Sequence, residues 1–366
     1  MHGARALPRP VVFYDFDLQF HPESLTPDFH ELPFMKSFIP SFVHPLVLAV
    51  AYPVILFLFV PAMARAQPAP FPAGPISVVV PLAPGDAADI AARALGDELS
   101  KLLKTPVLTV NRPGAGGAIG TSSVVQSRKD GHTILFAQNS ALTFRAVLDP
   151  QSVAYDALRD LAPLGIAART PSTLVVRGDA PFRNFAELID AAKKRPGQLR
   201  MGHPGAGSVG DFGVQLINAL TRADLLAVPY AGAAPSVVAL RGAHVEGVVL
   251  SLGALSTHIR SGAFRGIVSS SRSAEFPDIP TLRELGFREE LFGIWFSFFA
   301  PAGIPDDARK ALTGAIEQAV KSPAIAAKLA PLGILQSYGT PEQTTLEIRE
   351  EFKRVSEMAK KTGLAK

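Results

Sequence analysis

The sequence of 366 residues contains no cysteine. Disulfide bonds, cysteine-ligated metal ions and a thiol nucleophile are therefore excluded. Histidine is scarce beyond residue 66, and the four that remain, His132, His203, His244 and His258, show no i, i+4 pair of the kind that binds zinc from a helix. No metal site is expected. Without cross-links the fold must rest on its apolar core, for which 48% hydrophobic residues supply the material.

The signatures of common catalytic and nucleotide-binding sites are missing as well. Neither a G-x-x-x-x-G-K-[ST] phosphate loop nor a G-x-S-x-G nucleophile elbow occurs. Residues 205–210 fit G-x-G-x-x-G, but the next apolar strand ends at Pro229-Tyr230, without the acidic residue that would hold a ribose. The net charge of +4 is not gathered into a basic run that would bind nucleic acid. No enzyme activity, cofactor, catalytic residue or nucleic-acid partner is expected.

A long apolar segment near the N-terminus indicates export. Residues 37–64 carry no charged side chain, and Ala64-Arg65-Ala66 then gives the small-x-small pattern of a signal-peptidase site. We interpret 35–66 as a signal peptide cleaved before Gln67, which places the mature chain in the periplasm. The alternative is a membrane anchor, which needs about 20 apolar residues, and Pro53 and Pro61 interrupt this segment.

Residues 1–34 precede the expected signal peptide and show no hydrophobic period. A signal peptide begins close to its basic end, and Met35-Lys36 supplies such a start. We interpret 1–34 as lying upstream of the true translation start. A disordered extension is the alternative.

The mature chain alternates apolar strands with helical patterns. A first β-α-β-α-β series covers 76–137, a second runs from 172 to 270, and helices dominate 306–361. Such an order predicts mostly parallel sheets with helices on both faces. Segments 161–176 and 292–300 are the expected crossings between two lobes of a hinged binding protein. The predicted boundaries are 74–171 plus 293–366 for lobe 1 and 172–292 for lobe 2.

Each lobe contains a glycine-rich turn between a strand and a helix. The first precedes the helix at 86–103, and the second precedes the helix at 208–221. Helix N-termini attract anions through free N–H groups and the helix dipole. Two such termini facing one cleft would clamp a small carboxylate.

Acidic residues at both turns allow two interpretations. Asp86 with Asp89, and Ser208 with Asp211, have capping-box spacing, with the first of each pair as N-cap. Alternatively, one of these carboxylates accepts hydrogen bonds from a ligand. Asp89 could also pair with Arg93 one turn later. A third glycine-rich element, 111–120, is interpreted as a tight strand-to-helix turn rather than a direct ligand contact.

Several short motifs together carry a family resemblance. They are Pro81-x-x-Pro84-Gly85, Asn111-Arg112-Pro113-Gly114-Ala115-Gly116-Gly117, Asp130-Gly131-His132-Thr133-Ile134-Leu135, Gly205-x-Gly207-Ser208, Val228-Pro229-Tyr230-x-Gly232, Pro277-Asp278-Ile279-Pro280-Thr281 and Ala300-Pro301-Ala302-Gly303. In order and spacing this set resembles the Bug-type solute-binding component of tripartite tricarboxylate transporters, over nearly all of 74–366.

The resemblance implies a two-lobed α/β fold of the type II periplasmic-binding-protein (Venus-flytrap) kind. It also implies a carboxylate ligand held between the lobes and delivery to membrane permease subunits. Ligand contacts in the family come from three segments, which correspond here to 82–89, 137–140 and 206–211. The residues implied as ligand-binding are Leu82, Gly85, Asp86, Ala87, Asp89, Asn139, Ser140, Ala206, Gly207, Ser208 and Asp211.

Two departures from the family pattern bear on the ligand. The family usually has glycine at the position of Asp86 and histidine at the position of Asp211, so both changes add negative charge beside an anion site. We therefore expect a ligand with one carboxylate and a hydrogen-bond donor, such as an amino acid, a hydroxy acid or a heteroaromatic acid. The alternatives are a receptor for a signalling partner and an α/β enzyme that acts on a small organic acid.

Overall fold

The computed structural model describes residues 70–364. The chain divides into two units, Met1–Ala66 and Gln67–Lys366, and the described residues belong to the second. The predicted signal peptide and the upstream region lie outside the described residues.

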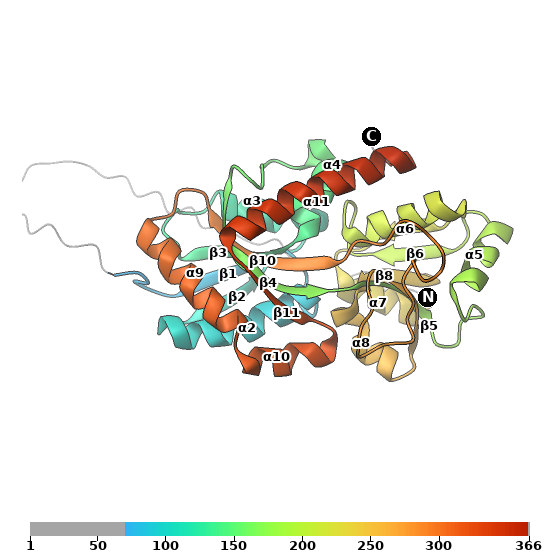
Figure 1. Ribbon diagram of the computed structural model, residues 1–366, viewed down its shortest axis with the longest axis horizontal. Helices are drawn as coiled ribbons and strands as arrows, with labels where there is room; N and C mark the ends of the chain where they lie inside the picture. The colour runs from blue at the N-terminus through green and yellow to red at the C-terminus, as the bar shows by residue number, and fades with distance from the viewer. Residues whose placement is uncertain (1–69, 365–366) are drawn as a thin grey trace, which may run out of the picture. The chain divides into compact units, whose positions relative to one another are not determined.

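Two sheets organise the described chain, and Figure 1 shows them in separate halves of the view, with helices around each. The first sheet has the strand order β11-β4-β10-β3-β1-β2, and the second has the order β7-β6-β8-β5-β9. The strands of the first sheet are β1 (Ile76–Val80), β2 (Val107–Asn111), β3 (Thr133–Gln138), β4 (Leu161–Thr170), β10 (Ile294–Pro301) and β11 (Leu335–Gly339). Those of the second are β5 (Ser172–Arg177), β6 (Arg200–His203), β7 (Leu226–Pro229), β8 (Gly247–Ser251) and β9 (Phe264–Ser269).

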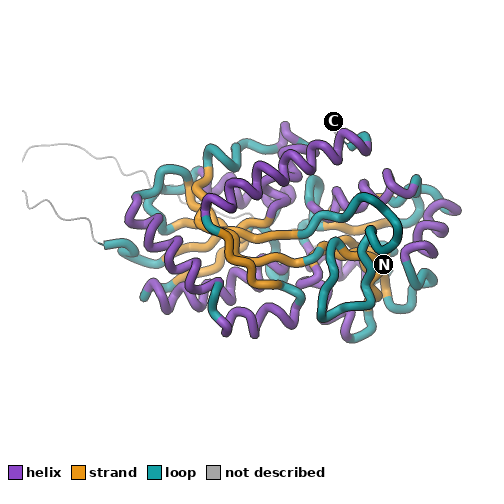
Figure 2. The backbone as a smooth tube through the Cα atoms, viewed as in Figure 1, coloured by secondary structure: helices purple, strands orange, loops and turns teal. Residues whose placement is uncertain are grey.

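Helices flank both sheets, as the tube in Figure 2 makes plain. Those of the first lobe are α2 (Ala87–Leu103), α3 (Ala118–Val125), α4 (Arg145–Leu148), α9 (Asp306–Val320), α10 (Pro323–Leu329) and α11 (Pro341–Thr362). Those of the second are α5 (Phe185–Lys194), α6 (Val209–Thr221), α7 (Ala233–Arg241) and α8 (Leu252–Arg260). Short helical turns occur at η1 (Ala115–Gly117), η2 (Ser140–Phe144), η3 (Pro150–Ser152) and η4 (Ala330–Leu332).

The two-lobed α/β fold expected from the sequence is confirmed, but the sheets are mixed rather than mostly parallel. β1 pairs in parallel with β2 and β3, and β6 pairs in parallel with β7 and β8. The strands that carry the chain between the lobes differ: β10 is antiparallel to both β3 and β4, and β5 is antiparallel to both β8 and β9. The chain must leave the first lobe along β4 and return along β10, so these two strands run in opposite directions.

Alternating residues of β1 explain why both faces of the first sheet are covered. Val78 packs in the same apolar cluster as α2 and α9, whereas Val79 packs with Val124 of α3 and Ile348 of α11. Successive side chains of a strand point to opposite faces, so a continuous apolar run produces a strand buried on both sides. The carboxyl ends of the parallel strands, where the glycine-rich turns begin, are thereby held by a rigid core.

Candidate functional site

The two helices at the glycine-rich turns begin as the capping-box spacing predicts. Asp86 is the N-cap of α2, and its side chain accepts a hydrogen bond of 3.0 Å from the Ala88 N–H. Ser208 is the N-cap of α6, and its hydroxyl accepts one of 3.1 Å from the Asp211 N–H. Each cap satisfies one donor that a helix start leaves free.

The third helical residue of each turn reaches back to the glycine before the cap. The Gly85 N–H donates to Asp89 Oδ2 at 3.0 Å, and the Gly207 N–H donates to Asp211 Oδ2 at 2.8 Å. The same closure thus occurs in both lobes. The N–H groups of these two glycines are therefore occupied by the protein's own carboxylates.

The two carboxyl groups of the first turn have opposite electrostatic surroundings. Burial raises the pKa of Asp86 to about 6, and the nearby negative charge of Asp89 adds to this rise. The hydrogen bond from the Ala88 N–H lowers the pKa by a smaller amount. Burial also acts to raise the pKa of Asp89, but hydrogen bonds from Arg93, the Gly85 N–H and Asn111 outweigh it and hold that pKa below its ordinary value. Both carboxyl groups are therefore mostly ionised at pH 7, but Asp86 takes up its proton at a higher pH than Asp89 as the solution is acidified.

A cavity of about 260 Å³ lies where the glycine-rich loops of the two lobes meet. Leu82 and Ala206, both implied as ligand contacts, share its wall, so the two turns open onto one space. The residues that line it are Leu82, Pro113, Gly114, Ala115, Gly116, Gly117, Arg145, Pro204, Gly205, Ala206, Pro229, Tyr230 and Ala231. Gly114, Gly116 and Gly117 all have positive φ angles, which confirms the tight turn expected there. The same turn forms part of the cavity wall.

Arg145 is the one charged residue in this lining. It is 6% exposed, and its Nη1 donates to the Ala206 carbonyl at 2.6 Å, while Nη2 lies 3.3 Å from Asp149 Oδ2. Its Nε is buried and has no hydrogen-bond partner within the described chain. A guanidinium in a cavity wall can bind an anion through charge-assisted hydrogen bonds.

Backbone and hydroxyl contacts also join the lobes beside this cavity. A Cβ at Gly116, where φ is 60°, would lie 2.9 Å from the Ala206 carbonyl oxygen. The Ser140 hydroxyl, directly after β3, accepts a hydrogen bond of 3.1 Å from the Val209 N–H at the start of α6. The lobes are therefore closed on one another at the glycine-rich loops.

Comparison with known proteins identifies the family to which this arrangement belongs. Residues 91–364 match the family model described as "Tripartite tricarboxylate transporter family receptor". The chain belongs to this family. Protein BugT of Bordetella pertussis is 35% identical over 80% of this chain and 90% of its own length.

Solved structures agree with the family assignment. MatC from Rhodopseudomonas palustris with bound malate has a TM-score of 0.74 and 28% identity, and the match covers 79% of this chain and 99% of MatC. An R. palustris protein with adipate has a TM-score of 0.77 and 27% identity, and the match covers 81% of this chain and 99% of that one. The receptor therefore has the fold of periplasmic solute-binding proteins.

The other implied contact residues of the receptor have these places. Gly85 is exposed, Ala87 and Ser140 are buried, and Gly207 packs against the stem of Arg145. The Asn139 amide donates to the Gly293 carbonyl at 3.0 Å and to Glu351 Oε1 at 2.8 Å, so this side chain is directed toward the strand β10 and α11. Asp86 and Ser208 accept hydrogen bonds within their own turns, whereas Asp89 also accepts from Asn111 and Asp211 from Gln215.

His203 stands beside the second turn and is 2% exposed. Its Nδ1 lies 3.0 Å from the Gly205 carbonyl, and its Nε2 lies 3.8 Å from Asp211 Oδ1. Burial lowers the pKa of His203, against the opposing effect of Asp211. A neutral imidazole that donates from Nδ1 to Gly205 fits this position and fixes the shape of the loop.

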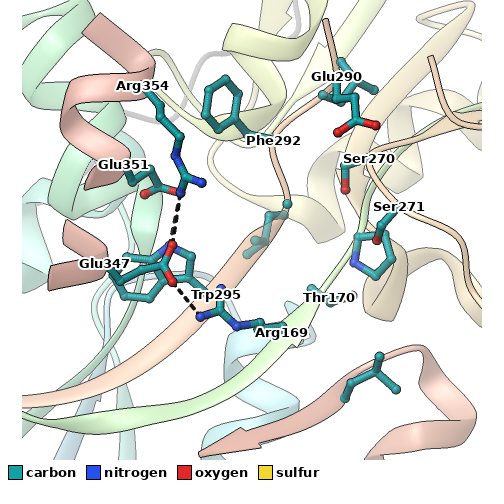
Figure 3. A pocket seen from close by; sticks show the side chains of 15 residues that line it. Arg169, Thr170, Ser270, Ser271, Glu290, Phe292, Trp295, Glu347, Glu351 and Arg354 are labelled. Atoms are coloured by element: carbon teal, nitrogen blue, oxygen red, sulfur yellow. Dashed lines mark hydrogen bonds and ion pairs between the residues drawn. The ribbon is translucent and has the colours of Figure 1, made fainter. Parts of the chain in front are cut away.

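A larger cavity of about 630 Å³ lies at the hinge of the receptor. It is bounded by the crossing strands β4 and β10, by α11, and by residues 270–271 and 290–293. Figure 3 shows Glu347 between two guanidinium groups: Arg169 lies 2.7 Å from its Oε2 and Arg354 lies 3.1 Å from its Oε1. Glu351, one turn further along α11, also lines this cavity.

Within 70–364, no group of three His, Asp or Glu side chains that could hold a metal ion comes together. Over the same residues, no helix combines the length and apolar character needed to cross a bilayer.

Arg145 and Glu351 were not singled out from the sequence. Arg145 comes after the apolar strand β3 and the short helical turn η2, and a lone arginine in that place carries no motif. Glu351 lies in an amphipathic helix rich in charged residues, where only the helical period could mark it: Ile348, Glu351 and Val355 share the buried face.

Proposed function

We propose that this receptor captures a small carboxylate in the 260 Å³ cavity between its lobes and passes it to membrane permease subunits. Arg145 carries the proposal. Its guanidinium lines the cavity with residues of both lobes and is the one charged group in that lining. A carboxylate that accepts from this group would be held by a charge-assisted hydrogen bond.

The ligand class follows from the charges of the cavity. One guanidinium lines it, and the acidic side chains of Asp86 and Asp211 belong to the adjoining turns. A second carboxylate on the ligand would meet no second cation there. We therefore propose a ligand with one carboxylate and a hydrogen-bond donor, although the similar structures named above hold malate and adipate.

The backbone loops remain part of the proposed site. Leu82 and Ala206 are placed to contact a ligand directly, and Ser140 to close the lobes over it through Val209. We propose that the other residues implied by the resemblance shape these loops. The acidic and serine side chains among them already accept hydrogen bonds at the two helix starts, and Asn139 bonds to Gly293 and Glu351.

Location, partner and domain limits are proposed on the family's role as transporter receptors. The mature protein would begin at Gln67 in the periplasm, with lobe 1 formed by 74–171 plus 293–366 and lobe 2 by 172–292. We propose binding without turnover of the ligand. Mass spectrometry of the N-terminal peptide of secreted protein tests the start: a peptide that spans Ala66-Gln67 would contradict it.

Calorimetric screening tests the ligand class. The panel contains amino acids, hydroxy acids, heteroaromatic acids, malate, adipate and citrate. We expect tight binding of a monocarboxylate that has a donor group. Tight binding of citrate, with no binding of any monocarboxylate, would contradict the proposal.

A further inference from the structure

Glu351 is a buried carboxyl group at the junction of three elements. It is 2% exposed, and it projects from α11 toward the hinge strand β10 and the segment after β3. Its Oε1 accepts from Asn139 Nδ2 at 2.8 Å and from Trp295 Nε1 at 3.1 Å. Its Oε2 lies 2.6 Å from Thr143 Oγ1.

The hydrogens available to this network can be counted. Thr143 has one hydroxyl hydrogen, yet its Oγ1 lies within hydrogen-bond distance of two acceptors, Glu351 Oε2 and, at 3.0 Å, the Asn139 carbonyl. It cannot donate to both. If Glu351 carries a proton on Oε2, that proton goes to Thr143 Oγ1, and Thr143 then donates to the Asn139 carbonyl.

The orientation of the Asn139 amide shows which oxygen of Glu351 is available for a proton. Its Nδ2 donates to the Gly293 carbonyl at 3.0 Å as well as to Glu351 Oε1, and a flipped amide would face that carbonyl with an oxygen. Glu351 Oε1 therefore accepts two N–H groups, which leaves Oε2 as the oxygen that carries the proton of the neutral acid. Every polar atom of Glu351 and Thr143 is satisfied when the acid is protonated.

The surrounding charges leave the buried acid without a cation of its own. Glu347 is the charged neighbour on α11, and both Arg169 of β4 and Arg354 of α11 pair with that residue. Across the cavity Glu290 pairs with Arg283. Burial raises the pKa of Glu351 to about 7, and the Glu347 charge adds to the effect against the three hydrogen bonds.

We propose that Glu351 is a positioning residue that, as a neutral carboxylic acid, ties the C-terminal helix and the hinge strand to the segment Asn139–Thr143 at the cleft. That segment includes Ser140, which accepts the Val209 N–H across the lobes. If Glu351 ionised, the Thr143 hydroxyl would donate to Glu351 instead of to the Asn139 carbonyl. The segment would then lose that internal hydrogen bond and loosen. The consequence for ligand capture rests on the proposed function, but the protonation state does not.

The chain carries its own reporter of this state. Trp295 is the one tryptophan in the sequence, and its indole N–H donates to Glu351. Emission is recorded from pH 5 to 9 for the wild type, for Glu351→Gln and, as a control, for Glu357→Gln, whose side chain on the same helix is 65% exposed. The amide of Glu351→Gln reproduces the neutral acid, because its oxygen accepts two N–H groups and its nitrogen donates to Thr143.

We expect the wild type and Glu357→Gln to change emission with a midpoint near pH 7. Glu351→Gln should show no transition and match the wild type at pH 5. A wild-type spectrum that is constant from pH 5 to 9, or a transition that Glu351→Gln retains, would overturn the proposal.

Hydrogen exchange and binding separate positioning from general stability. In Glu351→Leu, which leaves Asn139 and Trp295 without their acceptor, amides of 139–148 should exchange at least tenfold faster, whereas Glu351→Gln should keep them protected at all pH values. With the tightest-binding monocarboxylate of the calorimetric panel as probe, Glu351→Gln should lose any pH dependence of binding near pH 7. Equal exchange in the two variants would contradict a positioning role. If the wild type captures no carboxylate at all, the proposed function fails while the fluorescence result still stands.

Discussion

The guanidinium of Arg145 donates to the carbonyl of Ala206 across the cleft at 2.6 Å, although the two residues are 61 positions apart. This bond joins a lobe 1 side chain to a loop of the second sheet. The same guanidinium lines the cavity in which we place the ligand. Anion binding and lobe closure therefore share one group, which is how a ligand can favour the closed state of a hinged receptor.

Replacing Arg145 should abolish most of the affinity for carboxylates. Arg145→Met removes the charge-assisted hydrogen bonds, and we expect binding to weaken at least about 30-fold, equivalent to about 2 kcal/mol. Calorimetry with the best acid from the screen measures this. Arg128→Met is the control, because the Arg128 side chain is 88% exposed. Unchanged affinity in Arg145→Met would show that the ligand is held elsewhere.

A methyl group at Gly116 should prevent full closure. In Gly116→Ala the new Cβ would lie 2.9 Å from the Ala206 carbonyl oxygen. The strained φ costs about 1 kcal/mol in stability. Gly262→Ala is the matched control, because Gly262 also has a positive φ, 74°, but nothing lies within 4 Å of the added Cβ. We expect both variants to lose similar stability but only Gly116→Ala to lose affinity, by about tenfold, and to show a larger radius in X-ray scattering.

Asp89 should stabilise the protein at neutral pH. Its pKa is lowered in the folded state, so its contribution is present above the unfolded pKa and disappears as pH falls through the folded one. We expect Asp89→Asn to lose about 1–2 kcal/mol of unfolding free energy at pH 7. The difference in stability from the wild type should shrink as the pH falls below the ordinary pKa of aspartate. Thermal denaturation across pH measures it. Asp97→Asn is the control, because the Asp97 side chain is 72% exposed, and it should be as stable as the wild type at every pH.

Asp86, in contrast to Asp89, should destabilise the folded protein at neutral and alkaline pH. Its pKa is raised from 3.8 to about 6 on folding, so stability falls as pH rises between these values. Asparagine also caps helices and stays neutral, so Asp86→Asn should be more stable than the wild type at pH 8, by on the order of 3 kcal/mol, and similar to it at pH 3. A wild type that is the more stable of the two at pH 8 would mean that the carboxylate is better solvated than its burial indicates.

Local sequence patterns predicted the parts of the fold that depend on neighbouring residues. The caps at Asp86 and Ser208 follow from residues three apart, and the strand at 76–80 follows from its β-branched run. The crossings at 161–176 and 292–300 appear as β4, β5 and β10. The strand β11 and the helix α8 were not predicted, because Leu335–Gly339 is short and half-exposed and α8 follows β8 without a connecting turn.

The site depended on contacts between distant residues, which the sequence does not display. Asn139 was expected to contact ligand, yet its amide meets Glu351, 212 positions away. Arg145 gains its role only because the glycines at 116 and 207 leave room for its side chain between the lobes. Gly85 and Gly207 were implied as ligand contacts by the resemblance alone, and their N–H groups donate to the acidic residues four positions later.

Native mass spectrometry of the receptor purified from periplasm, beside Arg145→Met, tests the central claim most directly. We predict that the wild type carries one small acid with a single carboxylate, released on denaturation, and that Arg145→Met carries none while remaining folded. A wild-type protein that holds no acid from any source, or an Arg145→Met variant that retains the same one, would contradict capture of a carboxylate between the lobes.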